Sequence, residues 1–298
     1  MENTIVKKEQ RMRKMIKAQM GAKTCTQIAR SAKQPRGGYI NPKMMICEDM
    51  ADDEYRRTLV DGMKEENLMA NVVGVAVDYL LRYTYEAPGF KGKVEDMACL
   101  RIPRHGVRDS PELSMEEFSK QASRLNGDGL DDESIDAMCV LTAWDTMYRS
   151  GMSIDPETLH PNATTIEHIR MMVLKAREMM GDEQIVFGPT FEGGMPMNIH
   201  SADADYISGK WLVDMKVSKK EVPDAVQTLQ LAMYYIMGKL TLMSGFNPYE
   251  DAFYSMEGIE ILNPRCGVRW RLLMKDVPED VLDTILDDVM GGYDPAFA

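Results

Sequence analysis

Short apolar runs alternate with polar residues through the centre of the chain. Residues 184–187 and 195–200 form two such runs on either side of the pair Gly193-Gly194, and two runs across a glycine pair favour a β-hairpin. A third run, at residues 211–216, predicts another strand. After Pro223, apolar residues recur at helical spacing, which predicts a helix that packs on these strands.

The same patterns predict helices before this region and further strands after it. Helical spacing or a capping-box sequence predicts helices at residues 65–83, from Ser114, and at residues 134–150, 164–180 and 278–290. Extended runs occur at residues 253–255, 259–262 and 268–272. We therefore predict an α/β fold with a central mixed β-sheet of about four or five strands flanked by helices. The helices at about residues 105–182 form a helical insertion lobe.

Charge is distributed unevenly along the 298 residues, whose net charge is −12. Residues 1–46 carry eleven Lys and Arg and two acidic residues, so the rest of the chain holds a net charge of −21. We therefore separate a basic N-terminal helix and loop, residues 1–46, from one larger domain, residues 47–298. The amphipathic helix at residues 2–20 contacts nucleic acid or a protein partner, or docks by its Met face with its lysines in water.

The central strands carry the candidate chemistry. Side chains alternate along a strand, so Asp214 and Lys216 project to one side, and Asp203 and Asp205 also share a side. Pairing of the strands through the turn at residues 208–209 brings Asp205 close to Asp214. Two ionised carboxylates a few ångströms apart require a cation between them, and oxygen ligands with room for water suit Mg²⁺ or Mn²⁺. An ammonium alongside can hold or deprotonate a water molecule for phosphodiester hydrolysis.

The order of these residues resembles the PD-(D/E)XK nuclease superfamily, in particular its RecB-like exonuclease branch. The family pattern is an Asp, a turn, Asp/Glu-x-Lys on the next strand, and a helix with Gln-x-x-x-Tyr. This chain has Asp205, then Asp214-Met-Lys216, then Gln230-Leu-Ala-Met-Tyr234. The alternative is a β-hairpin with surface charges next to a polar helix face. The resemblance covers the region near Gly74 and residues 184–272, and it makes residues 47–298 a nuclease-like domain.

The resemblance implies roles for the matching residues. Asp205, Asp214 and the main-chain carbonyl of Met215 would coordinate Mg²⁺ or Mn²⁺, and Lys216 would position or deprotonate the attacking water. Gln230 would orient a ligand or touch the scissile strand. Tyr234 would stack or hydrogen-bond nearby, and the alternative for both is packing of the helix on the sheet.

Other residues enter as further candidates. The family carries Gly-x-x-x-His on its first core helix, whereas this chain has Gly74-Val-Ala-Val-Asp78, so Asp78 is a metal ligand or pairs with an arginine four residues later. Asp203 is a second-choice ligand. Glu192, His200, Arg149 and Arg265 are candidates for contacts with the site or with nucleic acid, and each has a structural alternative as a surface charge, a satisfied histidine or an ion-pair partner.

The expected function is therefore a metal-dependent deoxyribonuclease whose nucleic-acid partner is DNA. The alternatives are a nuclease-fold binding or regulatory protein without turnover, and a nuclease that acts on RNA or a small nucleotide. The five cysteines lack Cys-x-x-Cys spacing, which disfavours a zinc or iron–sulfur site. No phosphate-binding Gly-x-x-x-x-Gly-Lys-[Ser/Thr] loop is present. Without a signal peptide or a long apolar run, we expect a cytoplasmic protein with no membrane partner.

Overall fold

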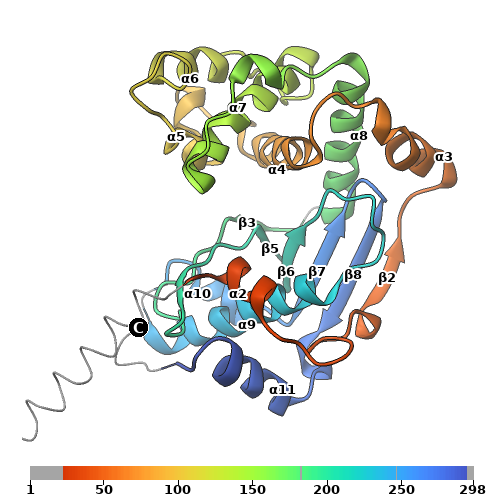
Figure 1. Cartoon of the computed structure of the whole chain (residues 1–298), viewed down its shortest axis with the longest axis vertical. Coiled ribbons are helices and arrows are strands. Elements are labelled where there is room, and N and C mark those ends of the chain that lie inside the picture. The colour runs from red at the N-terminus through yellow and green to blue at the C-terminus, as the bar shows by residue number, and fades with distance from the viewer. Residues whose placement is uncertain (1–22, 182, 246, 294–298) are drawn as a thin grey trace, which may run out of the picture.

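The computed structural model describes residues 23–181, 183–245 and 247–293. The described chain forms a body built on a mixed β-sheet and a lobe of helices packed above it (Figure 1). This confirms the predicted α/β class with a mixed sheet flanked by helices. The basic helix predicted at residues 2–20 lies outside the described residues.

The main sheet has six strands in the order β2-β8-β7-β6-β5-β3 among the described residues. Its strands, in chain order, are β2 (Ile46–Asp49), β3 (Ile185–Phe187), β5 (Tyr206–Ser208), β6 (Trp211–Met215), β7 (Gly258–Asn263) and β8 (Val268–Leu273). Strands β6 and β7 are parallel, and their other neighbours are antiparallel. Strands β5 and β6 form the predicted hairpin, in which Ser208 faces Trp211.

One face of this sheet is covered by helix α9 (Ala225–Ser244). Its N-terminus is fixed by a capping box, because Asp224 accepts the backbone N–H of Gln227 and the Gln227 side chain accepts the N–H of Asp224. Leu212 and Ile259 from the sheet share a buried core with this helix. The same core includes buried residues of α2 (Cys25–Ser31) and α10 (Glu250–Ser255). Helix α11 (Glu279–Thr284) packs against this core with partly buried residues.

The other face of the sheet packs against the helical lobe. The helices on this side are α3 (Asp53–Arg56), α4 (Ala70–Glu86), α5 (Arg101–Arg104), α6 (Met115–Ala122), α7 (Asp132–Ser150) and α8 (Ala163–Met180). Val213 and Met215 of β6 belong to the same buried core as α4, α7 and α8. Because Leu212 lies in the opposite core, β6 alternates between the two layers, as a strand buried on both faces must.

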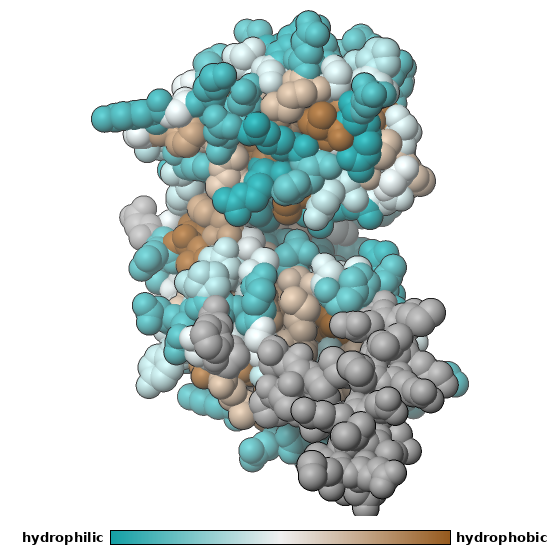
Figure 2. Space-filling view, turned by 90° about the vertical axis from the view of Figure 1, so that its left-hand side faces the viewer, coloured by the Kyte–Doolittle hydropathy of each residue, from teal (hydrophilic) through white to brown (hydrophobic). Residues whose placement is uncertain are grey.

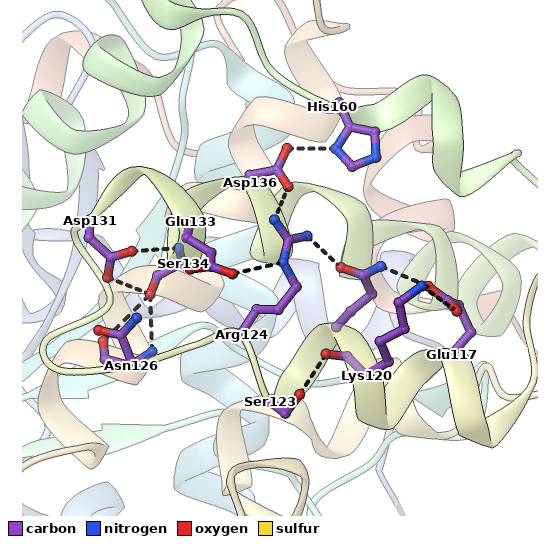
Figure 3. Close-up of polar contacts among 11 residues, drawn as sticks. Glu117, Lys120, Ser123, Arg124, Asn126, Asp131, Glu133, Ser134, Asp136 and His160 are labelled. Carbon is purple, nitrogen blue, oxygen red and sulfur yellow. Dashed lines mark hydrogen bonds and ion pairs between the residues drawn. The ribbon is translucent and has the colours of Figure 1, made fainter.

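In the part of the lobe that is distant from the sheet, a network of polar side chains connects the helices (Figure 3). Arg124 donates to Gln121 and pairs with Asp136 and Glu133. Asp136 in turn contacts the Nδ1 atom of His160 at 2.6 Å. These contacts join α6, α7 and the loop after α7, so they hold the helices of the lobe to one another.

The structure corrects two predictions. Residues 184–187 and 195–200 do not pair, because β3 pairs with β5, whereas β4 (Ile199–Ser201) pairs with β1 (Lys23–Thr24) in a separate two-stranded sheet. Residues 253–255, predicted as extended, belong to helix α10. There the side chain of Phe253 is buried among the residues of α9, so tertiary packing outweighs the strand preference of its aromatic residues.

Residues 23–49 pack into the body. Strand β2 begins at Ile46 and forms one edge of the main sheet, so the predicted boundary at residue 46 falls at the start of a strand. Helix α2 packs against α9. In the parts of the chain that the structure describes, we find no helix with both the length and the apolar character needed to span a bilayer.

Candidate active site

A cavity of about 330 Å³ lies between the helical lobe and the carboxyl end of β6. In the space-filling view the surface narrows between the lobe above and the body below (Figure 2). The charged residues that line the cavity are Asp78, Asp145, Arg149, Asp203, Asp205, Asp214 and Lys216. The cavity therefore collects residues from helices α4 and α7, from the segment before β5, and from β6.

The β5–β6 hairpin determines where the two central carboxylates lie. Val213 and Met215 point into the lobe core, so Asp214, between them, points to the opposite face of β6. Tyr206 pairs with Val213, which places Asp205 next to Asp214 across the hairpin. The Asp205 carboxylate accepts a hydrogen bond of 2.9 Å from the Met215 N–H, so the strand geometry brings these two acids together.

Burial makes this pair of carboxylates costly. Burial and then the neighbouring carboxylates of Asp214 and Asp78 raise the pKa of Asp205 to about 7. Asp214 is only 4% exposed, and its Oδ2 atom receives no well-aligned hydrogen bond from the residues that the structure describes. A buried carboxylate oxygen without a well-aligned hydrogen bond marks a place where a cation is stabilised.

Lys216 provides a cation at this place. Its Nζ atom lies 2.6 Å from Asp214 Oδ2 in an ion pair that is not aligned as a hydrogen bond. Burial alone would lower the pKa of Lys216, but Asp214 and Asp205 outweigh it and raise that pKa. In this arrangement Lys216 is an ammonium that pairs with Asp214 and offsets the charge of Asp205.

Helix α4 contributes Gly74 and Asp78 to the same cavity. Asp78 accepts hydrogen bonds from the Arg82 guanidinium at 3.2 Å and from the Tyr206 hydroxyl. The i,i+4 pairing predicted for Asp78 is therefore present, and the carboxylate also faces the cavity. Gly74 leaves space there, since a Cβ atom at this position would have only Val217 Cβ nearby, at 3.6 Å.

Gln230 and Tyr234 lie one helical turn apart on α9 and both line the cavity. Gln230 Nε2 donates to the Tyr234 hydroxyl at 2.9 Å and to Thr26 Oγ1 at 3.0 Å. The ring of Tyr234 stacks on Phe191, with centroids 5.4 Å apart. Helix α2 thus brings Thr26 into the site, where sequence reasoning had placed no residue, because nothing in the local pattern shows that α2 packs on α9.

The opposite wall comes from α7. Asp145 accepts hydrogen bonds from the Tyr79 hydroxyl at 2.6 Å and from Arg149 Nε at 2.9 Å. Arg149 Nη1 lies 3.7 Å from Asp203 Oδ2 on the body. Arg149 therefore pairs with carboxylates, which agrees with its interpretation as an ion-pair partner. The local signal for Asp145 was its i,i+4 spacing from Arg149 on a predicted helix.

Three other candidates lie elsewhere. Glu192 and His200 are exposed and are not part of the cavity lining. Arg265 is fully buried and bound to Glu66, so the interpretation that it reaches nucleic acid is wrong. Its place in the turn between β7 and β8 carries it under the lobe rather than to the surface.

The donor set fits a hard divalent cation. Asp205, Asp214 and the carbonyl oxygen of Met215 are oxygen ligands, and Mg²⁺ commonly binds one or two carboxylates and keeps several waters. Within the described ranges, no group of three or more His, Cys, Asp or Glu side chains is close enough to form a metal site. The cavity leaves room for water beside these oxygen atoms.

Comparison with known proteins gives no relative for this chain: no family model, no curated protein and no solved structure matches it.

Proposed function

We propose that the chain is a metal-dependent nuclease with a PD-(D/E)XK-type fold of the RecB-like branch, and that it hydrolyses DNA phosphodiester bonds. One observation carries the proposal: the residues with the order and spacing of that pattern line a single cavity, and they are Asp205, Asp214, Lys216, Gln230 and Tyr234. A hairpin with surface charges would expose these side chains, whereas Asp214 and Tyr234 are each only 4% exposed.

Each residue has a chemical task in this proposal. Asp205, Asp214 and the Met215 carbonyl would hold Mg²⁺ or Mn²⁺, which when bound would polarise a phosphoryl oxygen. Lys216 orients the attacking water through its Nζ atom. It accepts the proton of that water only when the charge of the two carboxylates that raise its pKa is offset. Gln230 and Tyr234 form the α9 wall and touch the bound strand.

The first prediction tests this proposal with linear duplex DNA, single-stranded DNA and RNA, in Mg²⁺, Mn²⁺ or EDTA. We expect cleavage of DNA that requires the metal. Asp214→Asn and Lys216→Ala should each lower the rate by roughly 10²–10⁴-fold, because they remove a ligand or the group that moves the proton. The substrate panel also separates a deoxyribonuclease from a nuclease that acts on RNA or small nucleotides.

The matched control is Lys210→Ala. Lys210 is an exposed lysine in the β5–β6 turn that pairs with Glu257, and it does not line the cavity. This variant should retain the wild-type rate. The unfolding temperature of each variant, measured on the same preparations, separates a loss of activity from a loss of folded protein. Cleavage that survives both site substitutions removes the assignment.

A second candidate is a nuclease-fold binding or regulatory protein without turnover. It is favoured by Asp78, which stands where the resembled family has histidine and is held by Arg82. Isothermal titration with Mn²⁺ separates the two functions. The nuclease should bind the ion and lose that heat on Asp205→Ala, whereas a protein without a metal site gives no heat in either form.

A further inference from the structure

A second basic side chain faces the cavity from the helical lobe. It belongs to Arg149, in the last turn of α7, and it is 47% exposed. We propose that Arg149 binds a backbone phosphate of the substrate strand, opposite Lys216. This inference rests on the proposed nuclease function and adds a substrate-binding residue to it. Figure 1 shows α7 running down from the lobe toward the body.

The guanidinium of Arg149 is held in a fixed direction by a buried partner. Asp145 is 3% exposed, and its Oδ1 atom accepts both Arg149 Nε, at 2.9 Å, and the Tyr79 hydroxyl, at 2.6 Å. Tyr79 is itself buried on α4. Because the Nε side is occupied in this way, the two terminal nitrogens of Arg149 form the end of the side chain that is open to the cavity.

The contact that these terminal nitrogens make is weak and open to exchange. Nη1 lies 3.7 Å from Asp203 Oδ2, beyond hydrogen-bonding distance, and both side chains are nearly half exposed. An ion pair of this kind contributes little to stability. A phosphate oxygen offers the planar guanidinium two short, charge-assisted hydrogen bonds, so it would displace Asp203.

The charge of the cavity makes such a cation necessary. Five carboxylates line it, and Lys216 and Arg149 are the cations of the described lining. Lys216 is committed to Asp214 at 2.6 Å. A phosphodiester that enters from the lobe side therefore meets Arg149 as the cation that offsets its charge. Asp203 then acts as the partner that occupies Arg149 in the free protein.

The second prediction measures binding of a labelled single-stranded oligodeoxynucleotide by fluorescence anisotropy, with Mn²⁺ and in a Lys216→Ala parent that does not cleave it. Arg149→Met should weaken binding by about tenfold or more. It should also reduce the slope of log K against log salt by about 0.7, the value for one phosphate contact with a single strand. Asp203→Asn should strengthen binding, because it removes the competing carboxylate.

These opposite signs distinguish a phosphate site from a bridge that merely joins lobe and body. If the pair were only a structural bridge, Arg149→Met and Asp203→Asn would change the affinity for the oligodeoxynucleotide in the same direction. That result overturns the proposal. Arg149→Lys should recover part of the affinity but not the bidentate contact. In the wild-type background, Arg149→Met should raise KM more than it lowers kcat.

The matched control is Arg101→Met, which changes an exposed arginine of the same lobe outside the cavity lining and should bind like the parent. If the wild type cleaves DNA and Arg149→Met binds normally, the phosphate site is wrong while the nuclease function stands. If the wild type cleaves no strand and the parent binds none, both proposals fail together.

Discussion

At the scale of single residues, the cavity concentrates charges that stability alone would not select. Asp205 has its pKa raised to about 7 by burial, by Asp214 and by Asp78, so ionisation of this carboxyl costs free energy in the folded protein. The Oδ2 atom of Asp214 lacks a well-aligned donor among the described residues. Departures of this kind from good packing and pairing are expected at functional sites.

Gly74 gives the third prediction. A Cβ atom there would make an ordinary contact of 3.6 Å with Val217, so Gly74→Ala should stabilise the protein by up to about 1 kcal/mol through the helix preference of alanine. Gly74→Leu should also fold, but its side chain would extend into the cavity and lower metal-dependent cleavage. Urea unfolding and a cleavage assay on the same preparations measure both effects.

Gly106→Ala is the contrasting control, because a Cβ atom at Gly106 would overlap the main chain of Trp144. This substitution should destabilise the lobe even though it adds the same single methyl group. Full activity in Gly74→Leu would show that the space beside Gly74 is not used by the substrate, and strong destabilisation by Gly74→Ala would show that the packing differs.

The proximity of Asp205, Asp214 and Lys216 could be predicted from the sequence because it depends on local geometry alone. A two-residue turn and the alternation of side chains along two strands determine which residues face each other. Thr26 and Asp145 reach the same cavity through the packing of α2 on α9 and of α7 on α4. Contacts between distant helices leave no periodic signal in the chain, so the place of these two residues in the cavity could not be predicted. The i,i+4 spacing of Asp145 and Arg149 indicates their ion pair alone.

At the scale of elements, the start of α7 shows how a helix of the lobe is fixed. Asp131 is its N-cap: it accepts the Ser134 N–H at 3.0 Å and the Ser134 hydroxyl at 2.7 Å (Figure 3). Burial would raise the pKa of Asp131, but these hydrogen bonds outweigh it and lower that pKa below its usual value of 3.8. The ionised carboxylate is therefore the form that stabilises the helix.

The fourth prediction follows from this cap. Asp131→Ala should lower the free energy of unfolding by about 1 kcal/mol at neutral pH. Because the folded pKa lies below the unfolded one, the charge-dependent part of this stabilisation is complete above pH 3.8 and is lost as the pH falls through the folded value. Chemical denaturation at several pH values should show that the difference in free energy of unfolding between wild type and Asp131→Ala becomes smaller in acid.

Asp131→Asn serves as the control for this prediction, because asparagine is also a good N-cap but does not titrate. Its stability should stay close to that of the wild type at neutral pH, and its advantage over Asp131→Ala should not change with pH. If the difference in free energy of unfolding between wild type and Asp131→Ala became larger in acid, that result would contradict the assigned role of the carboxylate.

The elements that could be predicted from sequence are those whose pattern is long or bounded by strong signals. Helices α7 and α8 are long, with many buried apolar residues, and α8 is followed by Gly181, whose φ is positive. The partner of β3 could not be predicted, because a three-residue strand does not specify which neighbour it pairs with. Helix α10 has only six residues, and its aromatic content favours a strand until the packing against α9 is known.

At the scale of the whole molecule, the site depends on how the lobe is held on the body. Two buried cores lie on opposite faces of the sheet, one shared with α4 and α8 and the other with α9. Arg265, in the turn between β7 and β8, is fully buried and binds Glu66 through two nitrogens, at 2.6 and 3.0 Å. Glu66 also contacts His168 of α8 at 2.8 Å, so this triad connects sheet, lobe and the segment that leads into α4.

The fifth prediction is that Arg265→Met destabilises the protein by about 3–5 kcal/mol, because it leaves the buried carboxylate of Glu66 without its main partner. Urea unfolding measures the loss. Arg104→Met removes an arginine whose partner Asp96 is half exposed and should cost no more than about 1 kcal/mol. The double variant Arg265→Met with Glu66→Met should be more stable than the single one, since no unpaired charge remains. A single variant as stable as the wild type would mean that the junction of lobe and body does not depend on this ion pair.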